Sequence, residues 1–285
     1  MTDTYPHTAF PRRFRRLARA LCAGFILAVP CPGWSDVMIL LHGHEGSSAD
    51  WRVSGFTRVL QDAGWRDGGV IDTVENTADL HAPAAAGSTD TFYALDLPSE
   101  TALTTQAARL DAALQRIQPR HPGEQLLFTG FSAGGVVARL YMVRHPNLPV
   151  RALCTIATPH LGTESAEIAL LAADSPLSEY AELFGAEFIN HSQALYRDLV
   201  RERPGSFLYK LNREVHPVAQ YIALVRVNSE AEPGDLVVPV YSQDMNNVTA
   251  LRGRVQTLSG PGEHGVLAED ARNILRTLQN KASTP

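Results

Sequence analysis

The sequence Gly130-Phe131-Ser132-Ala133-Gly134 has the pattern G-x-S-x-G and joins a strand-like segment to a helix-like segment. Residues 124–129 before it contain the apolar run Leu126-Leu127-Phe128, and the apolar residues after it recur at helical spacing until 145–146. A serine on such a tight turn projects its hydroxyl out of the sheet. The pattern is short, so a loop that merely caps a helix is the alternative, but the strand–turn–helix context favours a nucleophilic serine.

The composition is that of an ordinary globular protein. The chain has 285 residues, of which 45% are hydrophobic and 19% are charged, enough for one large core and a small additional cap. The net charge is -5, and no basic patch with interleaved aromatic residues recurs along the chain. Nucleic acid is therefore not an expected partner.

The first 35 residues have the order of a secretory signal peptide. Arginines precede the short apolar stretch Leu21–Val29, and Gly33-Trp34-Ser35 places small residues where a signal peptidase needs them. We expect cleavage after Ser35 and a secreted or periplasmic protein. The alternatives are an uncleaved membrane anchor and a disordered basic tail. The arginines are Arg12, Arg13, Arg15, Arg16 and Arg19.

The cysteines and histidines give no indication of a disulfide or a metal centre. Cys22 and Cys31 fall in the leader, so the mature chain would keep only Cys154, in an apolar run typical of a buried strand. His42-Gly43-His44 could be a metal pair, but no third ligand follows at a convincing spacing. The sequence therefore predicts no metal and no cofactor.

Short apolar segments alternate with helical patterns through most of the chain, which predicts an α/β fold with a mostly parallel sheet flanked by helices. The alternation stops at 164–218, where helical stretches carry scattered apolar residues, and we expect a helical cap or lid inserted into the 36–285 domain. Leu170, Leu171, Leu183 and Phe184 are its expected substrate-facing residues. Strands are expected at 37–41, 90–95, 124–129, 150–157, 221–228 and 254–258.

Three residues that could form a catalytic triad follow three different strands. Ser132, Asp235 and His264 occur in the chain order Ser-Asp-His, and the carboxyl ends of parallel strands meet at one edge of a sheet. His264 would take the serine proton, and Asp235 would hold the imidazole in the required tautomer. Asp244 is the competing choice for the acid, and a plain loop role is the alternative for His264.

A serine mechanism also needs two N–H donors for the oxyanion of the tetrahedral intermediate. The backbone N–H of Ala133 follows the nucleophile, and that of His44 follows His42-Gly43 at the end of the first strand. These two groups are the expected oxyanion hole. His42 and His160 are expected to order their loops rather than to take part in the chemistry.

Taken together, these motifs resemble the lipase branch of the α/β-hydrolase superfamily, in particular bacterial triacylglycerol lipases and the GPI-inositol-deacylase-like serine esterases. The resemblance covers residues from Val37 to the final helix. It implies a serine esterase with a helical cap over the site, and it leaves the substrate open. The chain departs from many bacterial lipases in offering no acidic pair for calcium and no disulfide near the triad. The motifs are 39–44, 130–135, 138–141, 156–163, 234–239 and 262–264.

The sequence therefore predicts a secreted serine carboxylic-ester hydrolase that forms an acyl-enzyme, acts on lipid or other carboxylic esters and contacts a lipid interface. A phospholipase or an acyltransferase with the same triad is one alternative. A catalytically silent hydrolase fold that serves as a binding protein is another, and the intact set of Ser132, Asp235 and His264 speaks against it.

Overall fold

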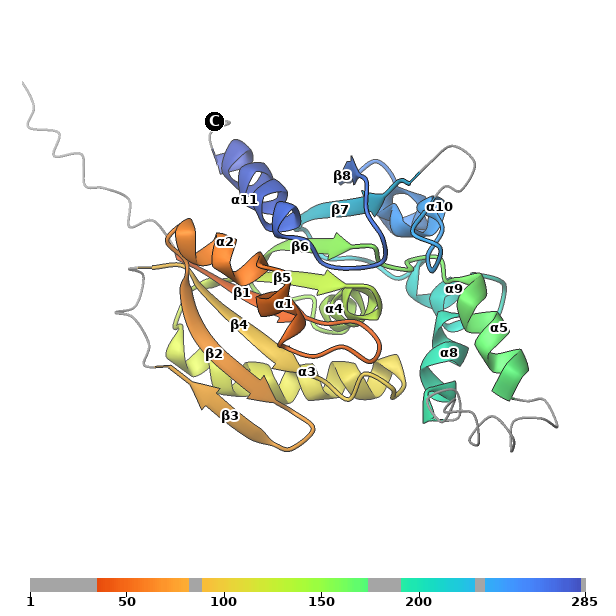
Figure 1. Ribbon diagram of the computed structural model, residues 1–285, viewed down its shortest axis with the longest axis horizontal. Helices are drawn as coiled ribbons and strands as arrows, with labels where there is room; N and C mark the ends of the chain where they lie inside the picture. Colours follow the sequence, from red (N-terminus) through yellow and green to blue (C-terminus); the bar gives the residue numbers. More distant parts are fainter. Residues whose placement is uncertain (1–34, 82–88, 174–190, 229–233, 283–285) are drawn as a thin grey trace, which may run out of the picture. The chain divides into compact units, whose positions relative to one another are not determined.

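A twisted, mostly parallel sheet forms the centre of the protein (Figure 1). The computed structural model describes residues 35–81, 89–173, 191–228 and 234–282. Within these residues the strand order is β3-β2-β4-β1-β5-β6-β7-β8, and every neighbouring pair is parallel except β2 with β3. The strands are β1 Asp36–Leu41, β2 Arg66–Asp72, β3 Thr77–Leu80, β4 Thr91–Asp96, β5 Gln125–Phe131, β6 Val150–Ile156, β7 Gln220–Arg226 and β8 Val255–Gly260.

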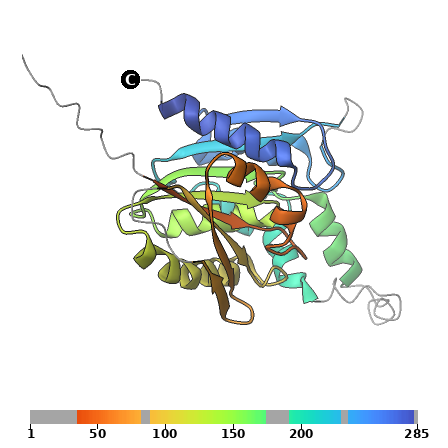
Figure 2. The same cartoon turned by 60° about the vertical axis from the view of Figure 1, so that its left-hand side comes forward.

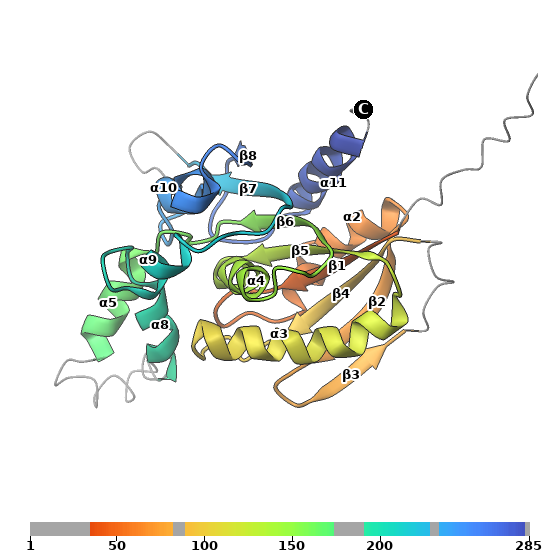
Figure 3. The ribbon, with the colours of Figure 1, turned by 180° about the vertical axis from the view of Figure 1, so that it is seen from behind.

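Helices cover both faces of the sheet, as a parallel sheet with two apolar faces requires. Helices α3 (Leu103–Ile117) and α4 (Ala133–Arg144) pack together on one face and are in front when the molecule is seen from behind (Figure 3). Helices α1 (Asp50–Val53), α2 (Phe56–Asp62) and α11 (Ala268–Ala282) lie on the other face, which Figure 2 brings forward.

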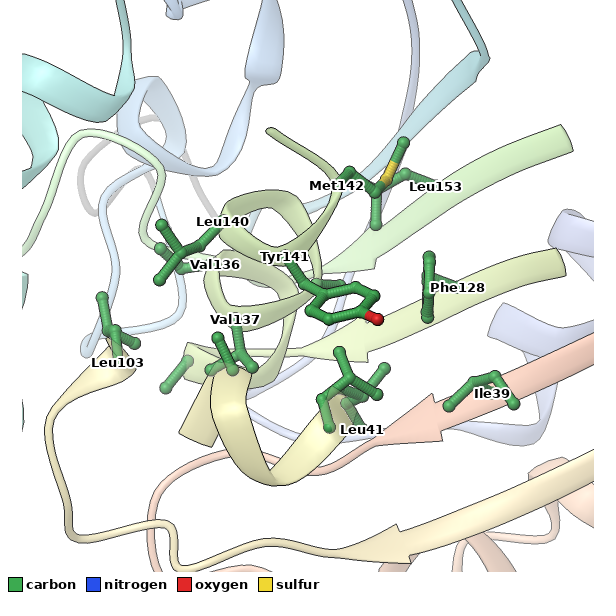
Figure 4. Packing of buried hydrophobic residues seen from close by; sticks show 14 of the residues in the cluster. Ile39, Leu41, Leu103, Phe128, Val136, Val137, Leu140, Tyr141, Met142 and Leu153 are labelled. Atoms are coloured by element: carbon green, nitrogen blue, oxygen red, sulfur yellow. The ribbon is translucent and has the colours of Figure 1, made fainter. Parts of the chain in front are cut away.

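The core between α4 and the sheet fixes the base of the serine turn. Tyr141 and Val137 of α4 point toward the strands that carry Phe128 and Leu41 (Figure 4), and all four side chains are buried. Alternate residues of β1 and β5 enter this cluster, while the residues between them, such as Met38 and Leu127, enter the core on the α2 and α11 face. Because both faces are buried, the central strands are continuously apolar rather than alternating.

Three helices lie in the described residues of the segment that interrupts the alternation between β6 and β7. They are α5 (Glu164–Ala173), α8 (Gln193–Leu199) and α9 (Phe207–Leu211), and they lie beyond the carboxyl ends of the strands (Figure 1). Further short elements are α10 (Val240–Gln243) and the 3₁₀ turns η1 (Gln118–Arg120), η3 (Met245–Asn247) and η4 (Thr249–Leu251). The expected cap residues Leu183 and Phe184 lie outside the described residues.

The predicted fold class, a mostly parallel sheet with flanking helices and a helical insertion, is confirmed. The sequence analysis missed the hairpin β2–β3 at the sheet edge, because β2 contains Gly68-Gly69 and a register shift rather than an apolar run. Gly55, with a φ of 77°, separates α1 from α2. No helix in the described part of the chain is both long and apolar enough to cross a membrane.

Candidate active site

Ser132 occupies a strained turn between β5 and α4. Its φ of 50° and ψ of -128° lie outside the regions that a non-glycine residue prefers, and such strain is retained where the surroundings enforce it. The N–H of Ser132 donates to the carbonyl of Ile156 (2.9 Å), and its own carbonyl accepts from Gly135 (3.1 Å). A Cβ on Gly130 would collide with the backbone of Gly135, so glycine is required for the helix to leave the strand so closely.

The structure brings Ser132, His264 and Asp235 into one hydrogen-bonded chain. Nε2 of His264 lies 2.9 Å from Oγ of Ser132, and Nδ1 of His264 lies 2.7 Å from Oδ2 of Asp235. Ser132 and Asp235 are 8% and 3% exposed, whereas His264 is partly exposed, so the chain runs from a buried carboxylate to the surface of the hollow described below. The spacing suits proton transfer from the hydroxyl to the imidazole.

Asp235 is held by four donors in a tight loop after β7. Its Oδ1 accepts from the N–H groups of Val237 (3.1 Å) and Val238 (2.8 Å). Its Oδ2 faces His264 and also accepts from Nε2 of Gln243 (3.3 Å). These bonds compensate the carboxylate for its loss of water and fix which oxygen faces the imidazole.

The competing acid, Asp244, has a different role in the structure. Its Oδ1 accepts from the N–H of Asn246 (2.9 Å) and from Oγ1 of Thr257 (2.8 Å), which caps η3 and ties it to β8. Within the described residues its carboxylate has no contact with His264. Asp235 is therefore the acid that the geometry places behind the imidazole.

A buried ion pair, which the sequence analysis did not identify, holds the loop of His264. Arg226 and Asp270 are 3% and 2% exposed. Nη1 and Nη2 of Arg226 donate to Oδ1 and Oδ2 of Asp270, at 2.8 and 2.6 Å. The same guanidinium donates to the carbonyl of Gly265 (2.8 Å), directly after His264. The side chain of Gln243 joins this support, since its Oε1 accepts from the N–H of Arg226 (2.8 Å). Gln243 and Asp270 lie 17 and 44 residues from Arg226 in the sequence, so no local pattern indicates these contacts.

The loop after β1 lies directly against Ser132. A Cβ on Gly43 would lie 2.9 Å from Cβ of Ser132, so only glycine allows this approach. His42 orders the loop: its Nε2 accepts from the N–H of Leu97 (3.0 Å), which leaves the proton on Nδ1 to be donated to the carbonyl of Gly43 (2.8 Å). Burial lowers the pKa of His42 and keeps its ring neutral, in agreement with the expected structural role.

The expected oxyanion donors, His44 and Ala133, are available for a ligand. Ala133 is the first residue of α4, where N–H groups have no acceptor within the helix. His44 lies in the turn that follows Gly43. Among the residues that the structure describes, neither N–H has an acceptor in the protein.

His160 is completely buried beneath this site beside Arg139 and His216. Its N–H donates to the carbonyl of Ser242 (2.9 Å), and its Nε2 lies 3.1 Å from Oγ1 of Thr155. Arg139 is also completely buried, and burial lowers its pKa to about 9. Nη1 of Arg139 lies 3.4 Å from Nε2 of His216. His160 thus orders the loop, as expected, and no group of three metal-binding side chains gathers anywhere in the described residues.

This buried group makes the folded protein sensitive to acid. Burial, together with the charge of Arg139, lowers the pKa of His216 from 6.5 to about 4 and that of His160 in the same direction. Between pH 6.5 and about pH 4 the unfolded chain binds more protons than the folded one. The contribution of the neutral His216 to the free energy of unfolding should therefore be fully present above about pH 6.5 and be lost as the pH falls toward 4.

We expect His216 alone to account for about 3 kcal/mol of unfolding free energy over that interval. Urea unfolding at a series of pH values measures this, and His216→Gln should flatten the dependence. Equal slopes in the two proteins would show that His216 is not the group that titrates.

Two hollows adjoin the candidate triad. A cavity of about 270 Å³ reaches Ser132 and Ala133 and is otherwise largely apolar, with Ala169, Leu195 and Leu199 from the helical segment in its wall. A second hollow of about 450 Å³ shares the wall residues Thr163, Ser165, Val237 and Val238 with it and continues past Ile168 and Tyr241. Leu170 and Leu171, which we expected to face the substrate, line neither hollow, and Leu171 is 73% exposed.

Comparison with solved structures places this arrangement in a known fold. The protein is similar to the product of the gene lin2722 from Listeria innocua, with 16% identity, a TM-score of 0.61, and 88% of this chain and 95% of that chain covered. It is similar to the mature form of the lipase BlEst2 from Bacillus licheniformis, with 16% identity, a TM-score of 0.58, and 90% and 95% covered. It also resembles the phospholipase PlaB from Legionella pneumophila, with 14% identity, a TM-score of 0.55, and 86% and 59% covered.

These likenesses define the fold of the chain, which is that of an α/β-hydrolase. The fold that the motif resemblance implies is therefore confirmed. At such low identity the reaction has to be argued from the site itself. No protein-family model and no curated protein matches the sequence.

Proposed function

We propose that this protein is a serine carboxylic-ester hydrolase of the lipase and esterase type that acts through Ser132, His264 and Asp235. The observation that carries the proposal is the continuous hydrogen-bonded chain of these three side chains, at 2.9 and 2.7 Å, which ends at Ser132 in the wall of a largely apolar cavity. A hydroxyl, an imidazole and a carboxylate in this order are the parts that acyl transfer needs.

In the acylation step, Oγ of Ser132 attacks the ester carbonyl carbon while Nε2 of His264 takes the hydroxyl proton. The carbonyl oxygen becomes an oxyanion, and the N–H groups of Ala133 and His44 are the donors proposed to stabilise it. Asp235 stabilises the imidazolium that forms. His264 then gives the proton to the leaving alcohol, and the acyl group remains on Ser132.

In the deacylation step, a water molecule replaces the alcohol. His264 takes a proton from the water, the resulting nucleophile attacks the acyl-enzyme, and the carboxylic acid leaves as Ser132 regains its proton from His264. His264 is partly exposed, whereas Asp235 is buried, so water can approach the imidazole without reaching the carboxylate.

The cavity beside Ser132 suits the acyl part of an ester. Most of its accessible lining is apolar, while Thr163 and Ser165 lie at its border with the second hollow and His44 and Tyr196 lie in its own wall. An apolar chain gains free energy from entering such a cavity roughly in proportion to the area it buries. We therefore propose lipid or other acyl esters as the substrates.

Ala169→Phe tests this assignment of the acyl cavity. The larger ring would fill part of the 270 Å³ hollow, so kcat/KM for p-nitrophenyl dodecanoate should fall by about tenfold or more while that for the acetate changes by less than about threefold. Leu171→Phe is the matched control, because Leu171 lies on the same helix and lines neither hollow. Equal losses on both esters would contradict an acyl role for the cavity.

The localisation is also a proposal. The basic, apolar and small-residue order of residues 1–35 supports export and removal of the leader. Cleavage after Ser35 would place the new α-amino group at Asp36, whose backbone nitrogen already donates to Oδ1 of Asp90 (2.8 Å). N-terminal sequencing of protein exported by a Gram-negative host checks this, and a start at Met1 would refute processing.

A further inference from the structure

The side chain of His44 connects the loop after β1 to the helical segment over the site. Its Nε2 lies 2.7 Å from Oγ of Ser192, 148 residues further along the chain. Its ring also packs edge-on against the ring of Tyr196, with 5.3 Å between the ring centroids. The backbone of His44 belongs to the loop beside Ser132, so this one residue contacts both parts of the site.

Ser192 and helix α8 are held by burial and by hydrogen bonds apart from this contact. Ser192 is completely buried, and its carbonyl accepts from the N–H of Tyr196 (3.0 Å). Toward the other end of α8, Asp198 accepts from the N–H of Leu103 at the start of α3 (2.9 Å). Leu195 and Leu199 of α8 are also buried in the core, so α8 is fixed to the α/β body independently of its contact with His44 and can hold the position of that loop.

The ring of His44 is suited to a fixed hydrogen bond. Burial lowers its pKa, with smaller opposing effects from Glu45 and Glu100, so the imidazole is neutral at pH 7 and keeps a single proton. The next residue, Glu45, has a positive φ of 54°, and its N–H donates to Oγ of Ser99 (3.1 Å). The loop is thus held on both sides of the His44 N–H.

We propose that the His44 side chain is a positioning group, which acts through Ser192 to hold the backbone N–H of its own residue at the place where the oxyanion develops. This inference rests on the proposed ester hydrolysis and adds that α8 of the helical segment is part of the machinery of the reaction. Donors that are slightly displaced lose much of their value, because an oxyanion is stabilised only by groups already oriented toward it.

A role as a wall of the acyl cavity is the competing explanation, because His44 also lines the 270 Å³ hollow. The two roles differ in what they affect. A wall residue changes KM and the preference among acyl chains, whereas a displaced oxyanion donor lowers kcat for every ester alike. The dependence of the loss on chain length therefore separates them.

The experiment compares Ser192→Ala, His44→Leu and His44→Gln with the wild type on p-nitrophenyl acetate and dodecanoate. Ser192→Ala and His44→Leu remove the hydrogen bond from opposite sides. His44→Gln places an amide nitrogen the same number of bonds from Cα as Nε2 and can keep the bond. Ser206→Ala is the matched control, since it removes a serine hydroxyl that caps α9 in the same insertion.

We expect Ser192→Ala and His44→Leu to lower kcat by about tenfold on both esters, with KM within about twofold of wild type. His44→Gln should recover most of the loss, and Ser206→Ala should have wild-type kcat. A loss confined to the dodecanoate, or unchanged kcat in Ser192→Ala, would overturn the positioning role. A wild-type protein without activity on either ester would instead contradict the proposed function, so the two failures are distinguishable.

Discussion

Ser132→Ala is expected to lower kcat for ester hydrolysis by on the order of 10⁴ to 10⁶ and to leave the fold intact. The hydroxyl is the only protein group in the proposed mechanism that forms a covalent bond to the acyl carbon. Alanine is also small enough for the turn between β5 and α4, where the backbone N–H and carbonyl of Ser132 are bonded independently of its side chain. Steady-state hydrolysis of p-nitrophenyl butyrate measures the effect.

Ser54→Ala is a suitable control for this prediction. Ser54 follows α1 in a partly exposed turn, where its hydroxyl donates to the carbonyl of Trp51, and it lines neither hollow. The Ser54→Ala variant should have the esterase activity of the wild type. Retained turnover in a clean preparation of Ser132→Ala, with urea unfolding unchanged, would remove Ser132 from the mechanism.

Asp235→Asn is expected to lower kcat by on the order of 10⁴, because it reverses the tautomer of His264. The side-chain oxygen of asparagine would stay toward the N–H groups of Val237 and Val238, which leaves the NH₂ group facing Nδ1 of His264. Nδ1 would then accept a hydrogen bond from this NH₂ group and Nε2 would carry the single ring proton, so the imidazole could not take the proton of Ser132. The pH dependence of kcat/KM, measured with the same ester, reports this change.

Asp244→Asn tests whether Asp235, rather than the competing Asp244, is the acid of the triad. Its carboxylate binds Asn246 and Thr257 and supports η3, so the variant should lose some stability and keep kcat within about threefold. If Asp244→Asn is the severely impaired variant and Asp235→Asn is not, the assignment of the acid is wrong.

The sequence predicted the parts of the fold and site that depend on local patterns. The apolar runs that became β1, β5 and β6 were recognisable because parallel strands buried on both faces are continuously apolar. Ser132, Asp235 and His264 each follow a strand of the parallel sheet, so their convergence at one sheet edge followed from topology. The loop-ordering role of His42 was inferred from its place next to Gly43, and the structure shows the hydrogen bonds that carry it.

What the sequence did not indicate depends on contacts between distant segments. The pair Arg226 and Asp270 reads as two surface charges until the fold buries them against the His264 loop. The strand β2 was missed because Gly69, with a φ of 110°, interrupts any alternation. Leu170 and Leu171 were chosen by hydrophobicity alone, whereas the helix turns Ala166 and Ala169 toward the acyl cavity.

The measurement that tests the central claim most directly is active-site labelling with a fluorophosphonate, followed by mass spectrometry of the digested protein. The reagent reacts with a serine only when a neighbouring base has activated it and an oxyanion site receives the phosphoryl oxygen. The account predicts a single adduct on the peptide that contains Ser132, loss of esterase activity in proportion to labelling, and no adduct in Ser132→Ala. A wild-type protein that remains unlabelled, or that is labelled at another serine, would contradict it.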